Sequence, residues 1–275
     1  AEGKTLDVSY TVDKGNFDVR AVASETLYGG KNITINAGKL NLSVENGGTG
    51  MSQAVLAKVG ATVTINADTA IFTSSKKESN GIYAGNRGIV NMNGNLEIQE
   101  DTGAEKYYAL KADGTGIVNV NIKDNNAGDN VVKFNGDIFA KDKDSGINLA
   151  LKGAESSWTG SSMNESADSA KHGQFNLWLT DGATWTNEKN GKEVPSGFTG
   201  SHVTNFTGGA DAAHAGNIFQ KDGKNLTIDK YSGNTNIFYA HSGNGEAADN
   251  YAAGDTIIKH AAEGSVVSMI CLLYT

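Results

Sequence analysis

Proline is almost missing from this sequence. Pro195 is the single proline in 275 residues, where average usage predicts about 14. Proline cannot donate a backbone hydrogen bond, so it is excluded from strands that are paired on both sides. Its scarcity rules out a proline-rich linker and a collagen repeat. It also indicates a chain in which nearly every backbone N–H is committed to a neighbouring strand.

Three further scarcities exclude other classes of protein. Cys271 is the only cysteine, so there is no disulfide framework. The sequence contains no run of 18 apolar residues, and it therefore predicts no membrane-spanning helix. Arg20 and Arg87 are the only arginines, and the net charge is −8. This charge argues against binding to nucleic acid or to an anionic membrane surface.

Glycine and asparagine are abundant instead. The chain has 35 glycines, against roughly 19 expected from average usage, and 29 asparagines. Both residues accept a positive φ at low cost, which suits tight corners between strands. Hydrophobic residues make up only 38% of the chain, yet they are spread along its whole length. This distribution favours a long, thin core over a single large one.

A tetrapeptide of apolar, polar, apolar and asparagine residues recurs through the first half. Its copies are Ile33–Asn36, Val63–Asn66, Val90–Asn93 and Val118–Asn121, with starts 30, 27 and 28 residues apart. A glycine lies two or three residues before each copy, and Val132–Asn135 followed by Gly136 repeats Val90–Asn93 followed by Gly94. A fixed period of this length is typical of a solenoid, and the alternation within each copy indicates strands.

We therefore predict an all-β fold, a single-stranded parallel β-helix of about ten rungs. One domain covers residues 1–268, with regular rungs from about 29 to 140 and less regular ones from 141 to 268. We expect loops to leave the coil at Ser156–Lys171, Glu188–Gly200 and Ala210–Ala215. Residues 269–275 abandon the Gly/Asn pattern and are interpreted as a truncation or an unrelated tail, the alternative being a last strand. The asparagines that end the repeats should stack into a structural ladder: Asn36, Asn66, Asn93, Asn121 and Asn135.

The sequence contains no motif that assigns a catalytic, cofactor-binding or metal-binding residue. Neither a Gly-x-Ser-x-Gly elbow nor a Cys-x-x-Cys or His-Glu-x-x-His motif is present. The five histidines are interpreted as solvated or capping residues, because none is paired at metal-ligand spacing: His172, His202, His214, His241 and His260. Trp158 is the tryptophan we expect to be exposed and able to bind a partner, whereas Trp178 and Trp185 should pack within one wide rung.

Two segments of the second half resemble a known family. Asn176–Trp185 and Lys224–Gly233, together with the Val-Thr-Ile-Asn rungs, are similar to stretches in the passenger domains of bacterial autotransporters, the pertactin-like adhesin group. The resemblance extends from about Gly29 to Ser268. It implies a right-handed β-helix that is secreted across the outer membrane of a Gram-negative cell. The signal peptide and C-terminal membrane barrel of that family are not in this sequence, so we expect the chain to be a fragment.

The resemblance implies a function in adhesion, aggregation and virulence without catalysis or a cofactor. The expected location is extracellular, at the cell surface, with membrane attachment only through the missing barrel. The expected partners are a surface protein or a glycan of a host or bacterium, or further copies of the chain. One alternative is a polysaccharide lyase or hydrolase, for which Glu97 and Asp137 are the nearest approach to an outward carboxylate pair. A phage or S-layer structural fibre is the other alternative.

Overall fold

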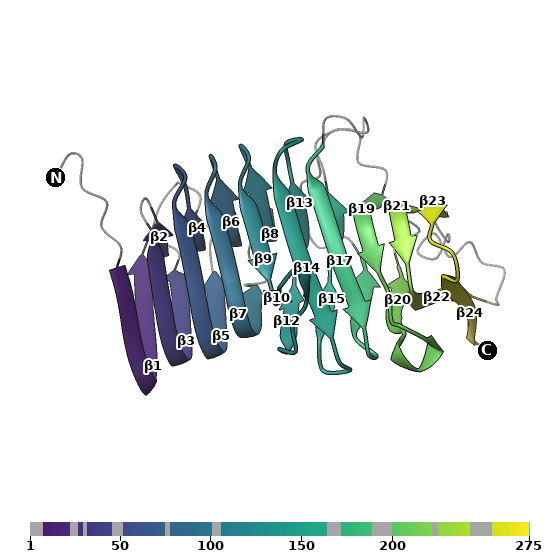
Figure 1. The fold of residues 1–275 in the computed structure, drawn as a ribbon, viewed down its shortest axis with the longest axis horizontal. Helices are drawn as coiled ribbons and strands as arrows, with labels where there is room; N and C mark the ends of the chain where they lie inside the picture. The colour runs from purple at the N-terminus through teal and green to yellow at the C-terminus, as the bar shows by residue number, and fades with distance from the viewer. Residues whose placement is uncertain are drawn as a thin grey trace.

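A computed structural model describes residues 8–22, 27–29, 32–45, 52–74, 78–100, 106–163, 172–188, 200–221, 225–242 and 255–274. These residues form an all-β parallel β-solenoid of about 6 turns. Figure 1 shows the rungs stacked side by side along the long axis of the molecule. The predicted parallel β-helix is thus confirmed, whereas its hand and the full count of about ten rungs stay predictions.

The first face of the coil is a continuous stack of parallel strands, each paired with the strand one rung away. It contains the N-terminal parts of β1 (Val8–Val22), β3 (Ile33–Glu45), β5 (Thr62–Ser74) and β7 (Ile89–Glu100), then β9 (Ile117–Val120), β14 (Gly146–Lys152), β17 (Gln174–Thr180), β19 (Gly200–Thr207), β21 (Asn225–Ser232) and β23 (Thr256–Ala261).

The second face begins where the long strands bend. In β5 the bend falls at the exposed Asp68, between the buried Ala67 and Ala70. The C-terminal parts of the long strands are followed on this face by β12 (Val132–Asn135), β15 (Ser157–Thr159), β18 (Thr184–Asn187), β20 (Gly216–Gln220), β22 (Asn234–Ser242) and β24 (Val266–Tyr274).

The third face is a separate six-stranded sheet that covers the first part of the coil. Its strands are β2 (Leu27–Gly29), β4 (Ser52–Ala57), β6 (Glu78–Gly85), β8 (Lys106–Asp113), β13 (Asp137–Ala140) and β16 (Ser162–Met163). One antiparallel hairpin, β10 (Ile122–Lys123) and β11 (Asn126–Ala127), is inserted between β9 and β12.

The glycine that lies two residues before a tetrapeptide has a steric cause in two of the rungs. Gly88 and Gly116 stand at the same corner of successive rungs, where the chain passes from the third face to the first. A Cβ on Gly88 would collide with the carbonyl group of Ala57, and one on Gly116 would collide with that of Ala84. Only glycine lets the backbones of neighbouring rungs approach this closely.

The interior is a single column of apolar side chains that the alternation of the strands turns inward. Val90, Val118 and Ile147 lie one above another on the first face and are fully buried. On the second face, Trp158 and Trp185 stack with ring centroids 4.7 Å apart and planes at 6°. Their indole N–H groups donate to backbone carbonyls, 2.9 Å away in each case.

Trp158 is therefore not exposed, and the prediction that it forms an outer binding aromatic is wrong. Its side chain is 0% exposed. The reason is that Trp158 occupies β15, within the segment expected to loop out of the coil, and pairs in register between Phe134 and Trp185. The first residues of that segment continue the solenoid as β15 and β16.

The other expected loops fall partly within the described residues. Residues 164–171 and 189–199, with Pro195 among them, lie outside the described residues. The third loop contains a short 3₁₀-helix, Ala212–His214, capped by the Asp211 carboxylate. The described ranges hold no helix with the length and hydropathy that a membrane span requires.

The C-terminal segment joins the coil as a strand. β24 pairs in parallel with β22, from Asn234 opposite Val266 to Ser242 opposite Tyr274. Residues 269–274 are thus part of the last strand of the second face, which is the alternative that the sequence left open for them. The strand continues across the expected domain boundary at residue 268 without a break.

Candidate functional site

A ladder of five asparagines runs along the outside of the first face. From the second member on, each side-chain Nδ2 donates to the Oδ1 of the asparagine one rung before it, over distances of 2.6–2.8 Å. The first member, Asn91, donates to the hydroxyl of Thr64 at 3.4 Å. We name this set the long ladder: Asn91, Asn119, Asn148, Asn176 and Asn205. Its members occupy the second position of the tetrapeptide column, and strand alternation turns them outward. The first four lie between two buried apolar residues, whereas Asn205 lies between Thr204 and the buried Phe206.

The long ladder forms the floor of a groove of about 530 Å³. The remaining lining residues come from the β10–β11 hairpin and from strands β17 and β19: Ile122, Asp124, Asn125, Trp178 and Thr207. Of these lining residues, Asp124 is the only charged one. Each of the three inner ladder amides uses one N–H and one oxygen lone pair within the ladder, so one donor and one acceptor remain on each of them for a ligand. Along the groove, these free donors and acceptors repeat at the spacing of parallel strands, about 4.8 Å.

Trp178 is the aromatic side chain of this groove. It lies on β17 in the outward register, between Leu177 and Leu179, which are both fully buried. Its strand neighbours on the adjoining rungs are Ala150 and Thr207. The sequence interpretation placed this tryptophan in the interior; the structure places Trp185 there and turns Trp178, half-buried, toward the groove.

The ladder predicted from the ends of the tetrapeptides forms over three residues. Asn66 donates to Asn36 at 2.7 Å, and Asn93 donates to Asn66 at 2.9 Å. We name these three residues the short ladder. Asn135 does not join it, because β12 pairs with the second half of β7, where Val132 lies opposite Leu96. The repeat at Val132–Asn135 therefore lies on the second face and is not a copy of the first-face rung.

Asn121 leaves the ladder because the chain turns at this residue into the hairpin. Its φ is +56°, and its buried amide nitrogen lies within hydrogen-bond distance of the carbonyls of Gly128, Asn130 and Ala150. Its Oδ1 accepts from the backbone N–H and the side chain of Asn130. Asn121 thus closes the base of the hairpin that forms one wall of the groove.

The carboxylate pair considered for the enzymatic alternative does not form. Glu97 is exposed on the second face, but Asp137 is 0% exposed. The carboxylate of Asp137 accepts a hydrogen bond from the backbone N–H of Ser161 at 2.8 Å. The prediction that Asp137 points outward is wrong, because this residue begins β13 at the corner between the second and third faces.

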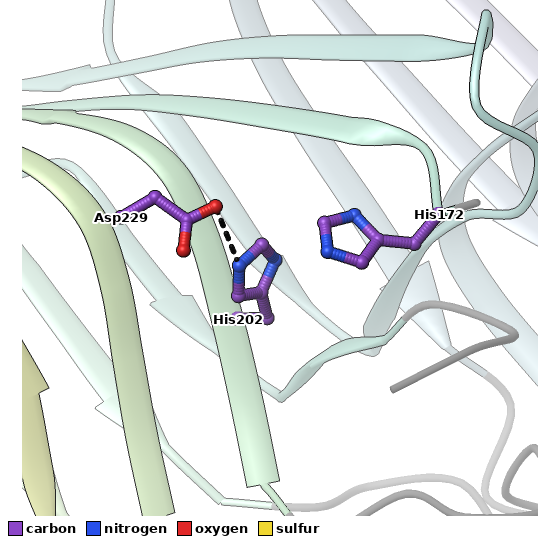
Figure 2. Close-up of side chains that lie close together, drawn as sticks. All are labelled: His172, His202 and Asp229. Carbon is purple, nitrogen blue, oxygen red and sulfur yellow. Dashed lines mark hydrogen bonds and ion pairs between the residues drawn. The ribbon is translucent and has the colours of Figure 1, made fainter. Parts of the chain in front are cut away.

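A second cluster of polar side chains was not foreseen in the sequence. His172, His202 and Asp229 come from three successive rungs, and one ligand-capable atom of each lies within 4.8 Å of the others. Figure 2 shows the two imidazole rings facing each other, with Asp229 behind His202. The sequence does contain one signal of this cluster. The three residues are 30 and 27 residues apart, and these separations match the period of the coil.

The charges of this cluster are set by burial and by a neighbouring lysine. Burial lowers the pKa of His202, and the hydrogen bond to Asp229 opposes this only in part. Burial alone would raise the pKa of Asp229, but hydrogen bonds from Lys259 and His202 outweigh it and hold the pKa below its usual value. Near neutral pH the cluster therefore contains a neutral His202 and an ionised carboxylate.

Comparison with known proteins does not identify a relative. No protein-family model, no curated protein and no solved structure matches this chain.

Proposed function

We propose that this chain is a β-helical passenger fragment of the autotransporter type, which acts outside the cell as a non-catalytic scaffold in adhesion or aggregation. The groove on the first face carries the proposal. Its floor of neutral amides and its single outward tryptophan suit an extended, uncharged polar ligand, and we propose a glycan chain. Sugar hydroxyls would pair with the free amide donors and acceptors of successive rungs, and the indole of Trp178 would stack on a sugar ring.

The proposed architecture is a right-handed coil of about ten rungs. Parallel strands joined by a crossover are right-handed in about 98% of cases, which favours this hand. The first-face path β1-β3-β5-β7-β9-β14-β17-β19-β21-β23 supports the fuller count. A long coil of this kind holds a binding surface away from the cell that displays it.

The tryptophans offer a direct test of the groove. Trp158 and Trp185 are fully buried, so a change of fluorescence when a soluble oligosaccharide is titrated should report Trp178. We expect Trp178→Ala to lower the affinity for a bound glycan at least tenfold, and Asn176→Ala to lower it several-fold. The matched control is Asn236→Ala, which removes an amide pair with Asn217 on the second face and should leave the affinity unchanged.

Two results would contradict the binding site. One is a glycan that binds equally well to the wild type and to Trp178→Ala. The other is a panel of neutral and acidic polysaccharides of which none binds, although the chain still attaches to cells.

Display at the surface needs a separate experiment on the cell that produces the protein. We expect externally added protease to remove the chain from intact cells, and we expect the same reading frame to continue into an outer-membrane barrel. A reading frame that continues into phage or S-layer structural genes would instead support the fibre alternative.

A further inference from the structure

The inference concerns the cluster of His172, His202 and Asp229, which lies apart from the groove and plays no part in the proposed glycan binding. His172 lies two residues before the start of β17, His202 lies on β19 and Asp229 lies on β21. The parallel stacking of these strands places residues far apart in the sequence side by side, at a spacing of about 4.8 Å per rung. The result is two imidazoles and a carboxylate within 4.8 Å of one another.

The hydrogen bonds of the two rings determine which nitrogen of each ring keeps its lone pair. Nδ1 of His172 lies 3.0 Å from the carbonyl oxygen of Gly173, which can only accept, so Nδ1 carries the proton and Nε2 the lone pair. Nε2 of His202 lies 2.9 Å from Oδ2 of Asp229. Because the ionised carboxylate accepts from Nε2–H, the lone pair of the neutral His202 ring is on Nδ1. In Figure 2 the nitrogen atoms that face each other are His172 Nε2 and His202 Nδ1.

The protein holds this arrangement rigidly and largely away from water. His172 is 6% exposed, and the side chain of His202 is 12% exposed. The backbone N–H of His202 donates to the hydroxyl of Ser162, and the hydroxyl of Ser162 donates to the carbonyl of His202. The two imidazoles lie edge to face, with ring centroids 4.3 Å apart and planes at 65°. Each keeps one nitrogen lone pair, so the cluster offers two ligands of the kind that a transition-metal ion binds.

We propose that His172 and His202 bind a divalent transition-metal ion through Nε2 and Nδ1, with Asp229 as the supporting carboxylate. Asp229 fixes the tautomer and orientation of His202, the role that a carboxylate plays behind a metal-bound histidine. Its Oδ1 is paired with Lys259 at 2.7 Å, which leaves Oδ2 to His202. Water completes the coordination on the open side. Imidazole ligands favour zinc, copper and nickel over calcium or magnesium, which prefer oxygen ligands.

The first experiment measures zinc binding by calorimetry on the purified chain after treatment with a chelator. We expect one equivalent of Zn²⁺ to bind, and neither Ca²⁺ nor Mg²⁺ to replace it. His172→Gln and His202→Gln should each abolish measurable binding, and Asp229→Asn should weaken it about 10–100-fold. Circular dichroism of each variant without metal checks that the coil is intact.

The chain contains a matched control. His214 and Asp211 form an exposed pair with Nδ1 and Oδ1 2.7 Å apart, which reproduces a histidine beside a carboxylate but lacks the second imidazole. His214→Gln should therefore bind zinc as the wild type does. Equal loss of zinc binding in His214→Gln, or unchanged binding in the double variant of His172 and His202, would overturn the proposal.

A second measurement keeps the test independent of the variants. Cu²⁺ added at one equivalent to the wild type should give an electron paramagnetic resonance spectrum with coupling to two imidazole nitrogens. A spectrum of aqueous Cu²⁺, or one with oxygen ligands only, would overturn the site even if every variant failed to fold. Glycan binding should be the same with and without metal, so either proposal can fail without the other.

Discussion

The two asparagine ladders run along the same coil but behave differently. The short ladder occupies the last position of the tetrapeptide, at the corner of the rung, and stops after Asn93. The long ladder occupies the second position, in the middle of a strand, and continues through five rungs to Asn205. The hairpin explains the difference, because it leaves the coil after Val120 and takes Asn121 with it. A mid-strand column is held by pairing above and below, whereas a corner column ends wherever an insertion redirects the chain.

The largest effect on stability should come from Asn121, the asparagine at which the chain turns into the hairpin and the short ladder ends. We expect Asn121→Ala to lower the free energy of unfolding by about 3 kcal/mol, since it leaves buried carbonyls without donors and puts alanine at a positive φ. Denaturant unfolding would measure the loss. Asn121→Gly removes the same hydrogen bonds without the backbone strain, so it should lose less than alanine. A loss below about 1 kcal/mol for alanine would show that the hairpin base does not depend on this side chain.

Next in size is the middle of the long ladder. Asn148→Ala removes the bonds to Asn119 and Asn176, both 2.7 Å long and partly buried. We expect a loss of about 1–2 kcal/mol in the free energy of unfolding. Because Asn148 and Asn176 share one bond, the double variant with Asn176→Ala should lose less than the sum of the two single losses. Strict additivity would show that the shared bond does not contribute to stability.

Among the described side chains, the third face contains a buried tyrosine whose ionisation depends on pH, unlike the amides of the ladders. Burial raises the pKa of Tyr108 from 10.0 to about 12, with the nearby Asp137 adding to the shift. A pKa raised on folding gives stability that is present below pH 10 and lost as the pH rises toward 12. Tyr108→Phe keeps the stack on Phe139, whose ring centroid is 5.0 Å away. Between pH 10 and pH 12 the free energy of unfolding of this variant should fall by about 1 kcal/mol less than that of the wild type. Asparagine does not titrate, so the two ladders contribute no such slope.

The smallest effect should be that of the short ladder. Asn66→Ala breaks two amide bonds, as Asn148→Ala does, but one of them is exposed to water. We expect a loss of about 0.5 kcal/mol. If Asn66→Ala and Asn148→Ala lost equal amounts, burial would not be what distinguishes the two ladders.

The period and alternation of the sequence predicted the strands of the first face, because the inward column Val63, Val90 and Val118 is readable from spacing alone. The long ladder was equally readable, since its members repeat at intervals of 28 and 29 residues and the first four stand in apolar-Asn-apolar triplets. The ladder predicted in its place used the corner asparagine, which is only one of the two repeated positions.

Other features could not be read from the sequence, for physical reasons. Whether a tryptophan points inward depends on the parity of its position in a strand, and Trp158 stood in a serine-rich segment with no clear strand pattern. The pairing of β12 with the second half of β7 depends on where the chain returns after the hairpin. The histidine cluster arises from rung stacking, which joins residues across a whole turn and leaves no local motif.

The direction of the backbone hydrogen bonds also has a mechanical consequence. In a parallel coil these bonds run along the axis, so a pull between the two ends loads the rungs in series and each bears the full force. Rupture should then proceed one turn at a time, and a turn of 28 residues would release roughly 95 Å of chain. Such a coil yields in short steps under tension, and the rung with the weakest lateral support sets the force at which the first step occurs.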